Sequence, residues 1–176
     1  MNILLGVTGS IAAYKACEIA SKLVKAGHTI DCIMTKSAQE FITPLSLQTI
    51  TKNKVVTDMF RRLEVAEVEH ISLAQKADIV LIAPATGNII AKLAQGVADD
   101  MLTTVVLAAY KKRRIFAPAM NTDMYENPIT QRNIAILKDQ GWEMIEPIKK
   151  VLACGDYGNG ALADVEDILS IIEICS

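Results

Sequence analysis

"NILLGVTGSIAAYKACEIASKLVKAGHTIDCIMT", residues 2–35, decides the fold class. Its first apolar run, 2–8, predicts a buried strand, and a second apolar run, 29–35, predicts another. Between them, residues 10–27 have helical spacing and end at a glycine, which is typical of a helix C-terminus. Strands without polar alternation are characteristic of parallel sheets that are covered on both faces. The segment therefore predicts a β-α-β unit.

The same alternation continues along the rest of the chain. Further strands are predicted at 55–58, 77–85, 113–120 and 142–147, and further helices at 70–77, 88–95, 101–111, 128–140 and 164–174. A regular succession of strands and helices is typical of doubly wound α/β proteins. We predict a Rossmann-like three-layer α/β/α sandwich with a parallel sheet, in which residues 1–176 form a single domain.

Composition narrows the class of protein further. The chain has 176 residues, 51% of them hydrophobic, and a formal net charge of −2, which disfavours both disorder and a basic nucleic-acid surface. The basic run "KKRR", 111–114, is interpreted as surface charge near a helix end. No apolar run approaches the roughly 20 residues of a membrane span, and no leader pattern follows Met1. We expect a cytoplasmic protein that binds neither membrane nor nucleic acid.

The cysteine pattern does not indicate a metal site. The four cysteines form no CxxC pair and have no histidine-rich spacing, so we expect no bound metal. Cys17 and Cys32 lie in apolar helical and strand patterns and are predicted to be buried. Cys154 lies in the glycine-rich segment 152–164, which predicts a loop, and is the candidate for a reactive thiol.

Short polar segments follow several of the predicted strands. They are "TGSI" (8–11), "TKS" (35–37), "PATGN" (84–88) and "PAMNTDM" (118–124). In doubly wound sheets, ligands bind outside the carboxyl ends of the strands. The loops therefore predict one binding site at that edge of the sheet.

The first two loops favour a mononucleotide over a dinucleotide. Gly9 and Ser10 open a helix and suit a phosphate, although a tight turn with Ser10 as helix N-cap is the alternative. An NAD site would place an acidic residue after the second strand, whereas this chain has Thr35, Lys36 and Ser37. Flavin mononucleotide (FMN) fits a crevice that is both apolar and lined with amides.

Four motifs carry a resemblance to a known family. "GVTGSIAAYK", "PATGN", "PAMNTDMY" and "ACGDYGNG" occur in the order and spacing of the flavin-dependent cysteine decarboxylases. The chain resembles most nearly the stand-alone members that act on 4′-phosphopantothenoylcysteine. The resemblance implies a carboxy-lyase that contains FMN, forms 4′-phosphopantetheine for coenzyme A biosynthesis, and assembles as a homotrimer or homododecamer. Gly87, Ile89 and Tyr125 depart from the family motifs.

The resemblance also implies a set of site residues. Those expected to bind FMN are Gly9, Ser10, Ile11, Thr35, Ser37, Ala85, Thr86, Asn88 and Met120. Those expected to bind substrate are Asn121, Met124, Ala153 and Gly155. His70, Asn121 and Cys154 are the expected catalytic residues.

The family chemistry explains why these residues are needed. Flavin oxidises the substrate thiol to a thioaldehyde, which accepts the electrons left when CO₂ departs, and the resulting enethiolate is then reduced. His70 would exchange protons, Asn121 would bind the substrate carboxylate, and Cys154 would supply a proton from a loop that closes over the site. The alternatives are helix caps at His70 and Asn121 and an incidental thiol at Cys154. Met120 and Met124 would pack on the flavin or fill the core.

Three other functions remain compatible with this fold. A peptidyl-cysteine decarboxylase would share the flavin, histidine and asparagine but accept a peptide C-terminus. A flavin prenyltransferase would share the sandwich without the His70, "PAMN" and cysteine-loop set. A non-catalytic regulatory subunit is the third.

Overall fold

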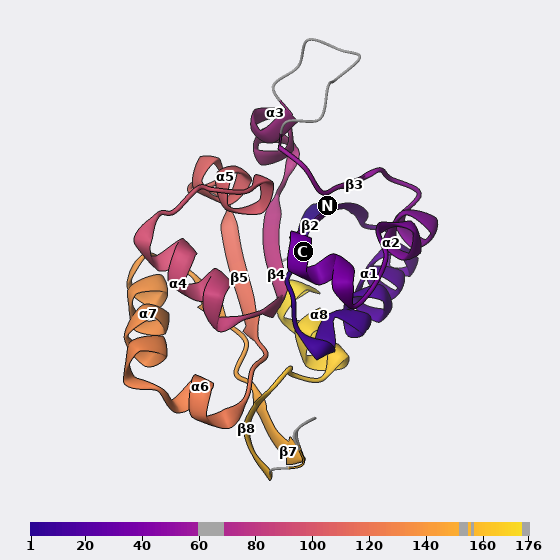
Figure 1. The fold of residues 1–176 in the computed structure, drawn as a ribbon. Helices are drawn as coiled ribbons and strands as arrows, with labels where there is room; N and C mark the ends of the chain where they lie inside the picture. Colours follow the sequence, from indigo (N-terminus) through magenta and orange to yellow (C-terminus); the bar gives the residue numbers. More distant parts are fainter. Residues whose placement is uncertain (60–68, 152–154, 156, 174–176) are drawn as a thin grey trace.

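Six parallel strands form the central sheet, in the order β3-β2-β1-β4-β5-β6 (Figure 1). The computed structural model describes residues 1–59, 69–151, 155 and 157–173. The strands are β1 (Asn2–Val7), β2 (Thr29–Met34), β3 (Val55–Val56), β4 (Ile79–Ala85), β5 (Arg113–Pro118) and β6 (Glu143–Met144). All six lie within the predicted ranges, so the predicted α/β fold is confirmed.

The order in which strands are added to the sheet changes sense at β1. β1 pairs with β2 on one side, where Leu5 lies opposite Cys32, and with β4 on the other, where Leu5 lies opposite Leu81. The chain therefore builds outward from β1 first in one direction and then in the other. Such a switch point opens a crevice at the carboxyl ends of the two strands, where ligands bind in doubly wound folds.

One face of the sheet is covered by α1 (Lys15–Lys25), α2 (Pro44–Thr51) and α8 (Val165–Glu173), which lie to the right of β4 in Figure 1. Their apolar side chains, such as Ile19 of α1 and Ile168 of α8, form one core cluster with Ile3 and Leu5 of β1. α1 has its apolar residues on one stripe, as expected for a helix on a sheet.

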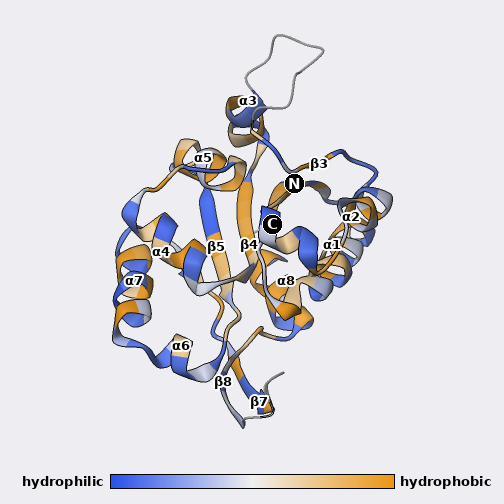
Figure 2. Ribbon diagram, viewed as in Figure 1, coloured by the Kyte–Doolittle hydropathy of each residue, from blue (hydrophilic) through white to orange (hydrophobic). Residues whose placement is uncertain are grey.

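The opposite face is covered by α3 (Glu69–Lys76), α4 (Gly87–Gln95), α5 (Met101–Ala108) and α7 (Pro128–Asp139). Their apolar side chains pack with Leu4 of β1 and Phe116 of β5 in a second core cluster. Figure 2 shows β4 apolar along its length, whereas β5 begins with hydrophilic residues. The two clusters on either side of the sheet give the three predicted layers.

Some elements differ from the sequence prediction. Two short 3₁₀ helices, η1 (Ile11–Tyr14) and η2 (Lys36–Glu40), follow β1 and β2. The sequence pattern predicted neither η2 nor α2, nor α6 (Thr122–Glu126). The predicted loop 152–164 is also corrected in part, because β8 (Tyr157–Ala161) pairs antiparallel with β7 (Ile148–Val151).

The predicted burial is confirmed for Cys32, which is 1% exposed in the core. Cys17 departs from its prediction, because it packs against the same cluster but is only half-buried. Burial raises the pKa of the Cys32 thiol to about 12, and the Asp31 carboxylate adds to that shift. Across the described ranges, no helix combines the length and apolar character that crossing a membrane demands.

Candidate active site

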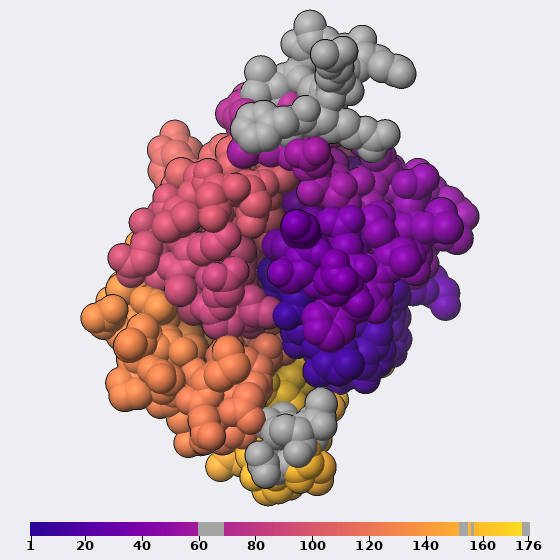
Figure 3. Space-filling view, in the orientation of Figure 1, coloured from indigo at the N-terminus to yellow at the C-terminus, as the bar shows by residue number. Residues whose placement is uncertain are grey.

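A cleft of about 960 Å³ opens at the carboxyl ends of β1, β2, β4 and β5. All four polar loops singled out in the sequence contribute to its wall, through residues such as Ser10, Thr35, Thr86 and Asn121. In Figure 3 the indigo and purple N-terminal segments meet the magenta and orange segments on one face of the molecule. The volume is at the upper end of the range for small-molecule sites, about 300–1,000 Å³.

Three hydroxyl groups on the cleft wall also cap helices. Ser10 Oγ accepts from the Ala12 amide at 3.3 Å, Thr35 Oγ1 from Ala38 at 3.3 Å, and Thr86 Oγ1 from Ile89 at 3.3 Å. The alternative reading of Ser10 as an N-cap is therefore correct, and the same residue lines the cleft. A cap uses an oxygen lone pair, so each O–H hydrogen can still be donated to a ligand.

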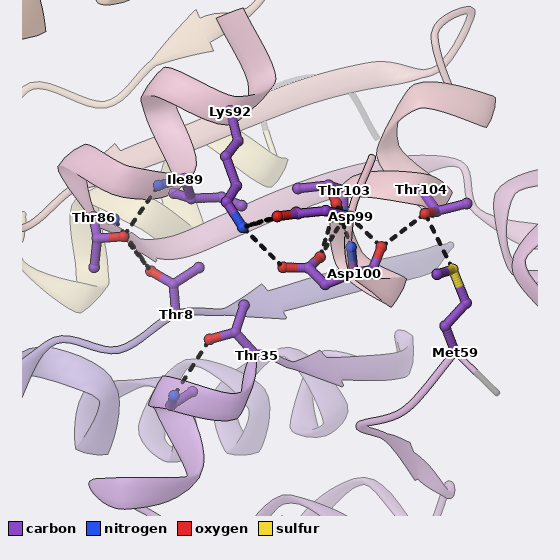
Figure 4. Close-up of polar contacts among 11 residues, drawn as sticks. Thr8, Thr35, Met59, Thr86, Ile89, Lys92, Asp99, Asp100, Thr103 and Thr104 are labelled. Atoms are coloured by element: carbon purple, nitrogen blue, oxygen red, sulfur yellow. Dashed lines mark hydrogen bonds and ion pairs between the residues drawn. The ribbon is translucent and has the colours of Figure 1, made fainter. Parts of the chain in front are cut away.

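The strand ends on either side of the switch point are tied together by Thr8 and Thr86. Thr8 Oγ1 donates its hydrogen to the Pro84 carbonyl at 2.7 Å. The same oxygen lies 3.4 Å from Thr86 Oγ1 and accepts from the Thr86 amide at 3.2 Å (Figure 4). These bonds satisfy the buried Thr8 hydroxyl. They also fix the loop after β4 relative to β1 at the floor of the crevice.

An ion-pair network forms another part of the wall. Lys92 Nζ lies 2.7 Å from Asp99 Oδ1 and 3.8 Å from Asp100 Oδ2, as Figure 4 shows. The hydrogen bond from Lys92 lowers the pKa of Asp99. Asp100 caps α5, accepting from the Thr103 amide at 2.8 Å, which confirms the helix start predicted at residue 101. Lys92 is thus neutralised by its own neighbours.

Asn121 follows β5 and lines the cleft. Its Oδ1 accepts from the Asp123 amide at 2.9 Å and caps α6, so the alternative predicted from the sequence also occurs. The cap occupies the carbonyl oxygen of the side chain. The amide −NH₂ is the group that can donate to a carboxylate, and capping holds the side chain in one orientation.

The two methionines of this loop lie on the cleft wall as well. Met120 packs in part against the second core cluster, and Met124 is 53% exposed. A Cβ added at Gly87 would meet Met120 Sδ at 3.6 Å and Met124 Cε at 3.8 Å. The methionines therefore border the start of α4, with their thioethers available to a flat apolar ligand.

Most of the predicted binding residues meet at this cleft. Those that line it are Gly9, Ser10, Ile11, Thr35, Ser37, Thr86, Asn88, Met120, Asn121 and Met124. Ala85 does not, because its side chain is fully buried in the second core cluster and its carbonyl accepts from the Ala119 amide at 3.0 Å. Gly155 is exposed outside the cleft wall, while Ala153 and Cys154 lie outside the described residues.

His70 is not brought to this cleft by its own chain. It lies in the first turn of α3, half-buried, and among the described residues that form the cleft wall none belongs to α3. α3 packs against α5, and its neighbouring Glu69 pairs with Lys54 at 3.1 Å. His70 can therefore act at a cleft of this kind only if that cleft belongs to another copy of the chain.

Sequence reasoning noted Lys36 but missed three other basic residues of the cleft. Lys15, Lys92 and Lys150 line it too, and Lys150 comes from β7, where it lies opposite Gly158 of β8. A lysine at the start of a helix or in an edge strand carries no local signal of binding. Only the fold brings residues 15 and 150 to one place.

A model of the flavoprotein family matches residues 1–174. The chain belongs to the flavoprotein family. This flavoprotein is 50% identical over 173 residues to the "probable phosphopantothenoylcysteine decarboxylase" of Streptococcus mutans, covering 98% of this chain and 97% of that protein. It is 48% identical to the coenzyme A biosynthesis bifunctional protein of Bacillus subtilis, of which it spans 42%.

Solved structures agree with this assignment. A PPC decarboxylase variant complexed with pantothenoylaminoethenethiol is 35% identical, with a TM-score of 0.86 and coverage of 99% of this chain and 97% of that one. The FMN-dependent cysteine decarboxylase SpaF is 31% identical, with a TM-score of 0.85 and coverage of 100% and 98%. The flavoprotein fold therefore extends over essentially the whole chain.

The cleft of this flavoprotein suits FMN. The O–H hydrogens of Ser10, Thr35 and Thr86 can serve a phosphate and a ribityl chain, which are rich in acceptors. Met101, Leu102 and Met120 supply an apolar wall for an isoalloxazine ring. The donor set and the apolar set come from different loops, as a ligand with one polar and one apolar end requires.

Proposed function

We propose that this flavoprotein is an FMN-dependent decarboxylase that converts 4′-phosphopantothenoylcysteine to 4′-phosphopantetheine in coenzyme A biosynthesis. The whole chain acts as one domain in this proposal. The reaction class is named for a relative that the chain matches over nearly the whole length of that relative. The pathway is named for a relative of which the chain matches one part. FMN is the cofactor named for a structural relative at 31% identity.

The convergence of four loops on one cleft carries the proposal. Ser10, Thr35, Thr86 and Asn121 are far apart in the sequence, and each follows a different parallel strand. They combine donors for a phosphate with an amide suited to a carboxylate. A protein that only bound FMN would need the phosphate donors but not an amide placed for a substrate carboxylate.

Bound FMN would supply a reversible two-electron acceptor for the substrate thiol. Ser10, Thr35, Ser37, Thr86 and Asn88 would hold it through hydroxyl and amide groups. Met120 and Leu102 would pack on its apolar part. The wall would also exclude water from the reacting carbon, which strengthens every polar contact made there.

Asn121 would orient the substrate carboxylate without neutralising it. An amide holds a carboxylate more weakly than Lys or Arg, so it stabilises less the charge that disappears as CO₂ leaves. His70 and Cys154 would exchange the protons that the thiol and the product carbon require. Cys154 would do so from the glycine-rich segment that follows β7.

We also propose a homotrimer or homododecamer located in the cytoplasm, as the resemblance implies. Large apolar side chains exposed on α5 and α7, such as Leu107, Tyr110 beside α5, and Ile129, support an assembled state. A neighbouring subunit would bring its α3, and with it His70, to the cleft described above. The position of His70 outside its own cleft supports this arrangement.

A comparison of two substrates, each assayed separately, tests the proposed function. The purified chain is loaded with FMN and given either 4′-phosphopantothenoylcysteine or a short peptide that ends in cysteine. We expect CO₂ release with the first and not the second. Release with the peptide alone would favour a peptidyl-cysteine decarboxylase, and release with neither would contradict the proposal.

Asn121→Asp provides a matched variant for that assay. Aspartate accepts the Asp123 amide hydrogen as well as asparagine does, so the α6 cap and the fold should persist. Its negative charge would face the substrate carboxylate, and we expect kcat/KM to fall at least about 100-fold. Unchanged turnover would mean that Asn121 does not bind the substrate carboxylate.

A further inference from the structure

Two lysines from opposite ends of the chain meet at the cleft. Lys15 is the first residue of α1, and Lys150 lies in β7, next to the glycine-rich segment. Both line the cleft, and the Lys150 ammonium contributes to the lowered pKa of Lys15. Neither residue belongs to the four loops that follow the strands of the main sheet.

The electrostatics of this pair are unfavourable in the protein by itself. Burial lowers the pKa of Lys15, the Lys150 ammonium lowers it further, and the carboxylates of Asp164 and Glu18 act in the opposite direction. Two ammonium groups brought together repel each other, and removal from water adds to the cost.

Among the described residues, no carboxylate forms an ion pair with Lys15 or Lys150. Lys92 on the same cleft wall pairs with Asp99 at 2.7 Å, and Lys22 of α1 pairs with Glu18 at 3.2 Å. Within the described part of the chain, neither Lys15 nor Lys150 lies within 4.0 Å of a carboxylate oxygen. A cleft that concentrates unpaired positive charge in this way is suited to an anion of more than one charge.

We infer that Lys15 and Lys150 bind the phosphate monoester of the substrate and set the preference of the enzyme for phosphorylated over unphosphorylated substrate. This inference rests on the proposed function. The substrate has two anionic ends, and Asn121 with its uncharged amide suits the carboxylate. A phosphate dianion at the other end gains most from two ammonium groups, which bind phosphate as point charges.

The phosphate of FMN is the other source of the same chemistry. The hydroxyls of Ser10, Thr35 and Ser37 after β1 and β2 suit that phosphate, and they belong to loops distinct from β7. Lys150 instead lies on the β7–β8 hairpin, which contributes Gly160 and Ala161 to the cleft wall. This placement favours the substrate phosphate.

The test compares 4′-phosphopantothenoylcysteine with pantothenoylcysteine, using FMN-loaded protein. For Lys15→Gln and Lys150→Gln, we expect the ratio of kcat/KM values, phosphorylated over unphosphorylated, to fall about 10- to 100-fold through KM. Calorimetric titration with 4′-phosphopantetheine and with pantetheine should show the same selective loss of affinity. Lys15→Arg keeps the charge and should recover most of the preference.

Lys149→Gln is the matched control, because Lys149 is exposed on the same strand and does not line the cleft. It should leave the ratio unchanged. An equal loss for both substrates, or variants that purify with less FMN than the parent chain, would overturn the inference. Parent protein that decarboxylates neither compound would instead contradict the proposed function.

Discussion

The backbone amide of Met120 donates a hydrogen bond to the carbonyl oxygen of Gly160 at 2.9 Å. This bond joins the turn after β5, which holds Asn121, to the β7–β8 hairpin, which holds Lys150. Gly160 has φ +123°, and a Cβ at that position would lie 2.5 Å from the Met120 carbonyl oxygen. The two halves of the cleft are therefore held together at a point where only glycine fits.

Gly160→Ala should separate the turn after β5 from the β7–β8 hairpin. The positive φ and the steric overlap together should lower the free energy of unfolding by about 3–5 kcal/mol, measured by urea denaturation. Gly96→Ala is the control, because Gly96 also has a positive φ, +69°, but nothing lies within 4 Å of the added Cβ. Its cost should be about 1–2 kcal/mol. Equal costs would mean that the contact with Met120 does not matter.

Gly9→Ala should weaken flavin binding. A Cβ on Gly9 would overlap Ser37 Cβ and lie 3.0 Å from the Ser37 carbonyl carbon, so the loops after β1 and β2 would have to part. We expect the Kd for FMN, followed by flavin fluorescence, to rise about 10- to 100-fold.

Gly87→Ala is its counterpart on the same cleft. The added Cβ would make only ordinary contacts with Met120 and Met124, at 3.6 and 3.8 Å. FMN affinity should stay within about threefold of the parent value. If both variants bind FMN equally well, the loops after β1 and β2 do not form the cofactor site.

Mixed assemblies should locate His70. In the proposed assembly, each site combines Asn121 of one subunit with His70 of a neighbour. In a mixed oligomer, a His70→Asn subunit supplies an intact Asn121 and a neighbouring Asn121→Asp subunit supplies an intact His70, so that site is complete. Neither variant alone should be active, and equal mixing with reassembly should restore about a quarter of the activity. No recovery in verified mixed oligomers would mean that His70 serves its own cleft or none.

The Arg113–Glu143 pair should make stability depend on pH. Arg113 binds both Glu143 oxygens at 2.7 Å, and this hydrogen bonding lowers the pKa of Glu143. A lowered pKa favours the ionised carboxylate in the folded protein, so the stabilisation is present above the unfolded value of about 4.3 and is lost as pH falls through the folded value.

Glu143→Gln should therefore cost about 0.5–1 kcal/mol at pH 7, a value reduced by solvent screening. The difference from the parent protein should shrink below about pH 4, measured by urea unfolding at several pH values. Glu146→Gln, which removes an exposed pair with Lys138 at 3.2 Å, should have less effect. A pH-independent cost would contradict the electrostatic origin.

The strands and most helices could be predicted because their apolar patterns are local. β4 is buried at every residue and reads as a continuous apolar run. α2 could not be found in the same way, since only Leu47 and Thr51 are buried, although Pro44 at its first turn is a start signal. β8 was missed because glycines are rare in strands, and only its packing against the turn at Met120–Thr122 requires them.

The site was predictable where it depends on strand ends, and not where it depends on tertiary placement. Ser10, Thr35, Thr86 and Asn121 follow strands directly, so topology alone brings them together. Lys15 and Lys150 meet only through the packing of α1 and the hairpin. The expected role of His70 came from the family resemblance, and no local pattern around residue 70 indicates which cleft its side chain reaches.

The most direct measurement of the central claim is the stoichiometry of a closed reaction without oxygen. FMN-loaded protein is mixed with 4′-phosphopantothenoylcysteine labelled at the carboxyl carbon, and labelled CO₂ and product are counted together. The account predicts one CO₂ and one 4′-phosphopantetheine for each substrate consumed, with the flavin absorbance restored at the end. Flavin-loaded protein that leaves the substrate intact, or that stops after reduction of its flavin, would contradict it.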